Sequence, residues 1–206
     1  MLIIEAMAKS APKRTKRNRP HAATVKAPMP ASLERMLPTL IRRPFSDPNW
    51  IYEPKWDGWR ALCFIRDGQA RFLSRKKNSL NERFPELRDI AKLVKADTVI
   101  LDGEIVALDA QGIPRFEGLH HRKQNFAVVY YSFDVLYLDG FDLTQCPLIV
   151  RKKALKKILP RGNTSRIRFT DHITGKGEPL FEKLEASRTG NQLQRMAGRD
   201  MRPCPR

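Results

Sequence analysis

Two short runs of alternating apolar and polar residues flank the dipeptide Asp67-Gly68. The runs cover residues 59–66 and 69–74. Aspartate and glycine tolerate the positive φ angles of a two-residue turn, so an Asp-Gly pair between two such runs is typical of a β-hairpin. The sequence therefore predicts an antiparallel pair of strands over residues 59–74, and the other elements of the fold have to be compatible with this hairpin.

Further strands are predicted over residues 98–109 and 126–138, which are rich in Val, Ile, Tyr and Phe. Helices are predicted after Pro85 and after Pro147, where apolar residues recur at helical spacing. Their predicted inward residues are Leu87, Ile90, Ala91 and Val94 in the first helix, and Leu148, Leu155, Ile158 and Leu159 in the second. The chain from about residue 31 onward is therefore expected to mix α and β structure.

The chain is strongly basic. Lysine and arginine number 39 against 22 aspartates and glutamates, a formal net charge of +17. Solubility asks only about 2 to 8 charges of a small domain, so the excess favours a polyanionic partner, for which nucleic acid is the natural candidate. Seven of the basic residues lie within residues 1–30 beside one acid, Glu5. We expect this segment to be a disordered basic arm that acts as a loose phosphate-binding tether. A solvated linker and a targeting signal are the alternatives.

The three cysteines are widely spaced and form no C-x-x-C pair, so the sequence predicts neither a zinc site nor a disulfide framework. No apolar run approaches the roughly 20 residues that a membrane-spanning helix needs, and the first residues lack the order of a secretory signal. The length of 206 residues suits one domain with tails. We expect a soluble intracellular protein.

Lys55 is the candidate nucleophile. It lies in the segment EPKWDGWR (residues 53–60), after the stiff Pro54, with two tryptophans nearby and with Gly58 to allow close backbone approach. Burial and neighbouring cations depress the pKa of a lysine and expose a nucleophilic amine. A surface lysine in the loop before a strand is the alternative.

The pattern K-x-D-G-x-R at residues 55–60 resembles motif I of the covalent nucleotidyltransferases, which comprise ATP-dependent DNA ligases, RNA ligases and mRNA capping enzymes. Three further segments follow in the family's order. They are FLSRKKNSLNERFPEL (residues 72–87), which is similar to the motif Ia segment, LDGEIVALD (101–109), similar to motif III, and VVYYSFDVLYLDG (128–140), similar to motif IIIa. These motif sequences are most similar to those of the ligase domain of bacterial non-homologous end-joining ligases, and the resemblance covers roughly residues 33–186.

The resemblance implies an α+β adenylation domain of antiparallel sheets flanked by helices over residues 31–186, without an oligonucleotide-binding (OB-fold) domain in this sequence. It implies that Lys55 attacks the α-phosphate of ATP and holds AMP as a phosphoramidate. Asp57 and Asp102 are expected to order loops rather than to catalyse.

The same resemblance implies which residues bind the nucleotide. Glu53 would accept a hydrogen bond from the adenine amino group, and Phe133 would stack on the purine. Arg60 and Glu104 would bind the ribose and phosphate side. Arg75 would lie near the nucleotide and the 5′-phosphate of a nick. Taken singly, Phe133 as plain core and Glu104 as a solvated edge residue remain alternatives, and His120 and His121 are not expected to bind metal.

The sequence departs from the family after residue 186. The family's motif IV (E-G followed by a pattern ending in lysine) and motif V (K-x-K) are not found there, and EGLHHRK at residues 117–123 lies in the wrong place to be motif IV. Residues 187–206 instead form an atypical basic tail with five arginines and one acid. A C-terminal truncation through a frameshift or early end is expected, with a genuine short tail as the alternative. AMP transfer would then lack the family's metal-binding carboxylate and triphosphate-binding lysines.

The sequence thus predicts an ATP-dependent DNA ligase that uses ATP and a divalent ion, Mg²⁺, with metal ligands that the sequence does not assign. Nicked or broken double-stranded DNA is the expected substrate, end-joining proteins are expected partners, and a monomer in the bacterial cytoplasm is expected. The alternatives are an RNA ligase or capping-type enzyme, and a fragment that binds nucleic acid without catalysis.

Overall fold

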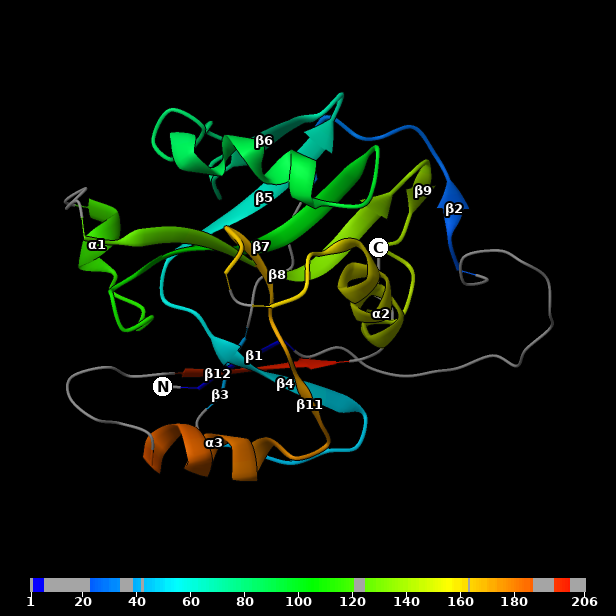
Figure 1. Ribbon diagram of the computed structural model, residues 1–206. Helices are drawn as coiled ribbons and strands as arrows, with labels where there is room; N and C mark the ends of the chain where they lie inside the picture. Colours follow the sequence, from blue (N-terminus) through cyan, green and yellow to red (C-terminus); the bar gives the residue numbers. More distant parts are fainter. Residues whose placement is uncertain are drawn as a thin grey trace.

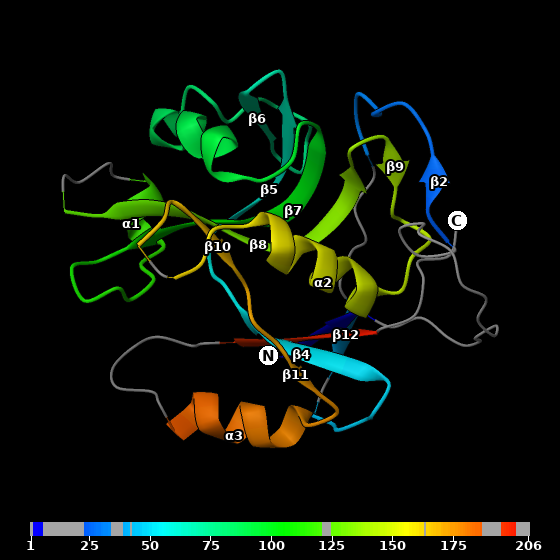
Figure 2. The ribbon, with the colours of Figure 1, turned by 45° about the vertical axis from the view of Figure 1, so that its right-hand side comes forward.

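Two β-sheets lie one above the other, and helices cover them (Figure 1). The computed structural model describes residues 2–5, 23–33, 39–41, 43–120, 125–162, 164–186 and 195–200. The larger sheet has seven strands and the smaller has five. Figure 2, turned by 45°, shows the same two layers with α2 (Leu148–Ile158) beside the larger sheet.

The larger sheet is centred on four antiparallel strands in the order β8-β7-β5-β6. They are β5 (Trp59–Arg66), β6 (Gln69–Leu73), β7 (Val99–Leu108) and β8 (Ala127–Leu138). Asp67 and Gly68 have φ angles of 52° and 70°, so the predicted hairpin turn between β5 and β6 is confirmed. The predicted strands over residues 98–109 and 126–138 are confirmed as well.

Three short strands complete this sheet, and they are β2 (Val25–Lys26), β9 (Phe141–Asp142) and β10 (Ile167–Phe169). β10 runs parallel to β8, whereas the other pairings in this sheet are antiparallel. The prediction of an α+β fold with antiparallel sheets is confirmed, with the parallel pairs of β10 with β8 and of β1 (Leu2–Glu5) with β12 (Arg195–Asp200) as local exceptions.

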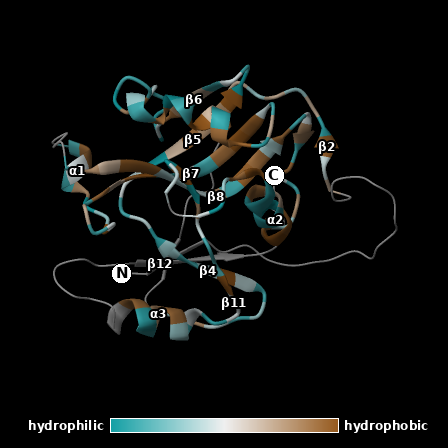
Figure 3. Cartoon of the chain, viewed as in Figure 1, coloured by the Kyte–Doolittle hydropathy of each residue, from teal (hydrophilic) through white to brown (hydrophobic). Residues whose placement is uncertain are grey.

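Both predicted helices form. The first, η1 (Pro85–Leu93), is a 3₁₀ helix rather than an α-helix, and it buries Leu87, Ile90 and Ala91. In α2 the predicted inward residues are buried too. A single turn, α1 (Glu117–His120), follows β7. Figure 3 shows hydrophobic residues along the strands of the larger sheet, where alternate side chains build the main core with η1 and α2.

The smaller sheet has the order β11-β4-β12-β1-β3. Its strands are β1 (Leu2–Glu5), β3 (Thr39–Ile41), β4 (Trp50–Lys55), β11 (Ile173–Thr174) and β12 (Arg195–Asp200). The helix α3 (Gly177–Ala186) covers one face of the sheet, where Leu180 packs with Trp50 and Tyr52. The described helices include none long and apolar enough to cross a membrane.

The two ends of the sequence meet in the smaller sheet. β1 pairs in parallel with β12, and β12 pairs antiparallel with β4. The sequence predicts an unstructured arm and an irregular tail for these segments, and the structure differs at residues 2–5 and 195–200. Pairing between segments nearly 200 positions apart supplies their backbone hydrogen bonds, and no local pattern reveals such pairing. The rest of the predicted tail, and residues 6–22 of the arm, lie outside the described residues.

Candidate active site

Lys55 is the last residue of β4, and β5 begins four residues later at Trp59. Its side chain is half-buried, and Nζ makes a long contact of 3.5 Å with the Trp56 carbonyl oxygen. The candidate nucleophile therefore stands where the chain passes from the smaller sheet to the larger one. Figure 1 shows this passage from β4 to β5.

Gly58 allows the segment between β4 and β5 to pack closely against β7. A Cβ atom at Gly58 would lie 2.1 Å from the Ile105 carbonyl oxygen and 3.0 Å from Cγ of Glu104. Any side chain would force the two segments apart, so the motif's glycine is required for packing. The close approach places the turn after Lys55 beside Glu104.

Arg60 is held by Asp102. Its Nε donates to Oδ1 at 3.2 Å and its Nη2 donates to Oδ2 at 2.9 Å. The guanidinium also lies 5.5 Å from the centre of the Phe133 ring, a cation–π arrangement. Asp102 is nearly fully buried and orients the Arg60 side chain, whereas the sequence predicted that it orders a loop.

Phe133 occupies an irregularity in β8. The register of β7 and β8 shifts between Asp102 and Gly103, so that Asp102 faces Asp134 while Gly103 faces Ser132. Phe133 is the extra residue, and a β-bulge of this kind re-aims a side chain. Its ring is half-exposed and is not part of the main core, so the alternative of plain core does not describe it.

Glu104 is the acidic residue of the site whose pKa is shifted. Desolvation by burial raises the pKa of its carboxyl to about 7, against the opposing charges of Lys55 and Arg60. The negative charges of Asp102 and Asp57 act in the same direction as burial. A raised pKa from burial beside a lysine and an arginine is typical of functional sites.

Glu53 is nearly fully buried and accepts a hydrogen bond from Nζ of Lys152. Lys152 lies on α2 and was not predicted from the sequence as a site residue. A signal for it was present, since Lys152 lies four positions after Leu148, three before Leu155 and seven before Leu159, on the apolar stripe of the helix. A lysine on such a stripe indicates a buried partner.

Trp56 extends the site on the other side of Lys55. Its ring stacks on Tyr131, with centroids 3.7 Å apart and planes at 19°. Its Nε1 donates to Oγ1 of Thr170 at 3.0 Å. The tryptophan after the candidate nucleophile is therefore fixed against β8 and the loop after β10.

Four strands supply the predicted residues: β4 carries Glu53 and Lys55, β5 carries Arg60, β7 carries Glu104 and β8 carries Phe133. Contacts or charge interactions link Glu104 to Lys55 and Arg60, and Arg60 to Phe133. Arg75 differs, since it is exposed in the turn after β6. Of the two histidines, His120 packs edge-on against Trp59 and Phe116, and His121 lies outside the described residues.

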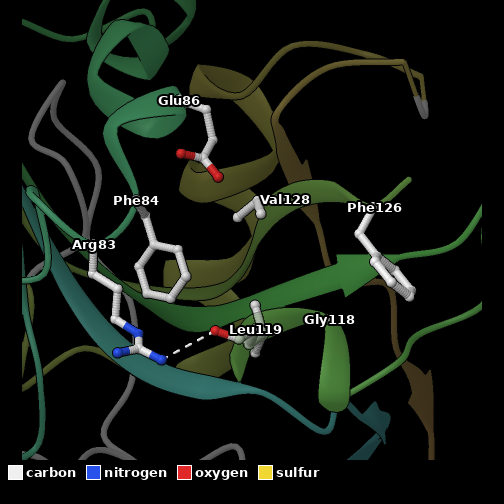
Figure 4. Close-up of a pocket in the computed structure, with 7 residues that line it drawn as sticks. All are labelled: Arg83, Phe84, Glu86, Gly118, Leu119, Phe126 and Val128. Atoms are coloured by element: carbon white, nitrogen blue, oxygen red, sulfur yellow. Dashed lines mark hydrogen bonds between the residues drawn. The ribbon is translucent and has the colours of Figure 1, made fainter. Parts of the chain in front are cut away.

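A separate pocket of about 160 Å³ lies beside η1 and α1 and includes none of the predicted site residues. Figure 4 shows its lining, in which Nη2 of Arg83 donates to the Leu119 carbonyl oxygen at 3.1 Å. Phe84, Leu119 and Val128 of this pocket belong to the main core. This pocket is small and mostly apolar, whereas the charged candidate catalytic residues surround Lys55.

The residues around Lys55 fit a nucleoside triphosphate, because the cationic Lys55 and Arg60 and the aromatic rings of Trp56 and Phe133 lie in this region. Among the described residues no group of three or more His, Cys, Asp or Glu is placed to hold a metal ion. Mg²⁺ commonly binds through one or two carboxylates together with substrate phosphates. Glu104 and Asp57, which interact electrostatically next to Lys55, fit that smaller requirement.

Comparison with known proteins places this domain in a family. Residues 28–188 match the family described as "ATP dependent DNA ligase domain". The multifunctional non-homologous end joining protein LigD of Mycobacterium bovis is 33% identical over 133 residues, which cover 65% of this chain and 17% of that protein. The SPbeta prophage-derived DNA ligase-like protein LigB of Bacillus subtilis is 37% identical over 127 residues, 60% of this chain and 46% of that protein. The chain thus spans less than half the length of these relatives.

Two solved structures share the fold. The ligase domain from M. tuberculosis LigD superposes with a TM-score of 0.58 at 32% identity, over 68% of this chain and 45% of that one. The mycobacterial DNA ligase D complexed with ATP and MES gives a TM-score of 0.61 at 27% identity, over 76% of this chain and 56% of that one. With the motif lysine, the two-sheet fold and the family match over residues 28–188 in agreement, the chain belongs to the family of ATP-dependent DNA ligase domains.

Proposed function

We propose that this chain carries out the adenylation step of an ATP-dependent DNA ligase, with Lys55 as the nucleophile. The observation that supports this proposal most directly is that Glu104, which faces Arg60 across two adjacent strands of the larger sheet, interacts electrostatically with the lysine at the end of β4. The unprotonated Nζ attacks the α-phosphorus of ATP, an N–P bond forms, and the P–O bond to pyrophosphate breaks. The proton that Nζ then loses passes to solvent or to the ionised Glu104.

The remaining predicted residues take the parts of a nucleotide pocket. Glu53 accepts a hydrogen bond from the adenine amino group, and Phe133 stacks on the purine. Arg60, already oriented by Asp102, and Glu104 bind the ribose and phosphate side. Arg75, exposed on its turn, is available to the 5′-phosphate of a nick.

A divalent ion belongs to the proposal. Glu104 and Asp57 would hold Mg²⁺ with the phosphates of ATP, and the ion would neutralise negative charge on those phosphates. The chain's own residues then orient the nucleotide, through Arg60, and keep water from the lysine, through the stacked Trp56.

Nicked or broken double-stranded DNA is the proposed substrate, because the chain carries a formal net charge of +17 and its relatives are named as non-homologous end joining proteins. The same names support the proposal that the protein repairs DNA breaks in the bacterial cytoplasm, and we further propose that it acts as a monomer together with end-joining proteins. The basic residues within residues 1–30 are proposed to bind phosphate.

Nick sealing by the 206-residue polypeptide is proposed to be impaired. Motif IV and motif V do not occur in residues 187–206, so preorganised charge around the triphosphate is reduced. Removal of one such charge or donor commonly costs on the order of a hundredfold in rate. The alternative is that Arg188, Arg195 or a partner protein supplies the missing cations. Arg195 pairs with Lys55 in the register of β12 and β4, while Arg188 lies outside the described residues.

The first test is covalent labelling with ATP that carries a radioactive α-phosphate. We expect label on the wild-type chain, loss of label in Lys55→Ala, and full label in Lys95→Ala, a matched exposed lysine. Label retained by Lys55→Ala would contradict the assignment. Labelling by GTP in preference to ATP would favour a capping-type enzyme, and DNA binding without any label would favour a non-catalytic fragment.

The second test is sealing of a nicked duplex with ATP and Mg²⁺. We expect sealing to be far slower than lysine labelling, and slower than in a chain extended through motifs IV and V. Multiple-turnover sealing at the rate of labelling would contradict the impairment. In that event Arg195→Gln decides whether the tail's cation is responsible. A comparison of nicked DNA with nicked RNA separates a DNA ligase from an RNA ligase.

A further inference from the structure

Lys152 is an unusual lysine. Its side chain is 0% exposed, although the helix α2 that carries it has exposed lysines at positions 153, 156 and 157. A buried ammonium is costly unless it is paired and hydrogen-bonded. Its environment therefore has to supply partners at fixed places.

Three acceptors surround the Lys152 ammonium. One is the Glu53 carboxylate on β4, the second is the Thr170 carbonyl oxygen at 2.9 Å, and the third is the Phe133 carbonyl oxygen at 3.2 Å. An ammonium has three N–H donors, so three directed hydrogen bonds match its capacity. The Phe169 ring lies 4.8 Å from Nζ and closes the site on another side.

These contacts join parts of the molecule that are far apart in sequence. Glu53 lies two residues before the candidate nucleophile on the smaller sheet, whereas Phe133 lies on the bulge of the larger sheet. Thr170 in turn binds the Trp56 indole through its hydroxyl. The buried Lys152 thus connects Glu53 and Phe133, the two sides of the proposed base pocket. Through Thr170 it is also linked to Trp56, the residue after Lys55.

Charge makes the tie specific. Glu53 is only 2% exposed, and the buried Lys152 ammonium is the cation that compensates the charge of its carboxylate. An ionised carboxylate only accepts hydrogen bonds, whereas a protonated one also donates. An acceptor is what a purine with an amino group at position 6 needs from its binding site.

We propose that Lys152 is a positioning residue that sets the base preference of the site, by fixing the Glu53 carboxylate and the Phe133 backbone for a purine that carries a 6-amino group. This inference rests on the proposed adenylation of Lys55. It adds a residue from outside the motifs, on the helix α2.

The experiment compares two nucleotides in covalent labelling of the full chain. ATP carries the 6-amino group and purine riboside triphosphate lacks it. We expect the wild type to show a lower KM for ATP. In Lys152→Met the KM for ATP should rise about tenfold or more, the factor that one hydrogen bond to a charged group is worth, while the KM for purine riboside triphosphate changes little.

Lys153→Met is the matched control, since it removes the neighbouring, exposed ammonium from the same helix. It should keep the wild-type preference. A wild type that never labels with either nucleotide would overturn the adenylation proposal itself. A wild type that labels, with Lys152→Met keeping the same preference between the two nucleotides, would overturn the role of Lys152 alone. An equal rise in KM for both nucleotides would also overturn it, because that is the signature of a general structural loss.

A second pair of variants keeps the test decisive if Lys152→Met does not fold. Glu53→Gln retains an amide oxygen that accepts a hydrogen bond, and Glu53→Gln with Lys152→Met leaves neither buried charge uncompensated. We expect the single variant to keep part of the preference for ATP and the double variant to lose it. Equal preference in both would show that Lys152 does not position the residue at 53.

Discussion

Arg60 makes a two-point pair with Asp102, its diagonal neighbour on β7, while Glu104 lies directly opposite it in the sheet. Both bonds of the Arg60 guanidinium fork reach the same carboxylate, at 3.2 and 2.9 Å. A two-point pair fixes the plane of the guanidinium as well as its position. Arg60 is therefore preset before a nucleotide arrives, and Glu104 keeps its own place beside Lys55.

Asp102→Asn should weaken adenylation without a change at the nucleophile. The amide keeps the size of the carboxylate but accepts through one oxygen only and carries no charge, so the two-point pair is lost. We expect labelling of Lys55 to fall about tenfold, the worth of one charge-assisted hydrogen bond. The control is Asp67→Asn, which alters an Arg–Asp pair that is 68% and 86% exposed and should leave labelling unchanged. Unchanged labelling in Asp102→Asn would show that Arg60 needs no preset orientation.

Gly58→Ala should destabilise the fold. The added methyl would lie 2.1 Å from the Ile105 carbonyl oxygen, and backbone cannot move aside cheaply. Overpacking of this kind costs about 1–3 kcal/mol, to be measured by urea unfolding. Asp57→Ala, an exposed neighbour, should stay within about 0.5 kcal/mol of the wild type. A Gly58→Ala chain as stable as the wild type would mean that β7 and the turn can separate.

The Glu104 carboxyl should make stability depend on pH. Its pKa is raised from 4.5 to about 7, chiefly by desolvation, so the folded chain holds a proton that the unfolded chain releases between these values. Stability therefore falls as pH rises from about 4.5 to 7, by at most about 3 kcal/mol from this group. Glu104→Gln should remove that fall, and it should be more stable than the wild type at pH 8 but not at pH 4. Parallel curves for both chains between pH 4 and 8 would contradict the raised pKa.

Binding to DNA should depend steeply on salt and weakly on sequence, because the basic residues are spread along the chain. Deletion of residues 1–30 would also remove β1, so substitution is the cleaner test. Replacement by glutamine of the six basic residues Lys9, Lys13, Arg14, Lys16, Arg17 and Arg19 should flatten the slope of log affinity against log salt. Each lost phosphate contact removes about 0.9 from the slope on duplex DNA. An unchanged slope would make this segment a passive linker.

The local patterns in the sequence determined much of the larger sheet. The Asp-Gly turn, the β-rich runs and the two apolar helical stripes each depend on neighbours within a dozen positions, and each formed where it was predicted. The family and the motif lysine followed from short contiguous motifs for the same reason. The choice between an α-helix and the 3₁₀ helix of η1 was beyond such patterns, since the apolar spacing of Leu87, Ile90 and Ala91 does not distinguish the two over so short a segment.

The tertiary structure alone decided which residues meet across long distances in the chain. The sequence placed Lys152 among five basic residues of one helix, and only packing of α2 against β8 and β4 buries it on Glu53, 99 positions away. Likewise, only the pairing of β12 with β1 and β4 brings residues 195–200 beside Lys55. A residue's charge and helical position are local properties of a sequence, whereas desolvation and strand pairing depend on which distant segment arrives, and that is settled when the whole chain folds.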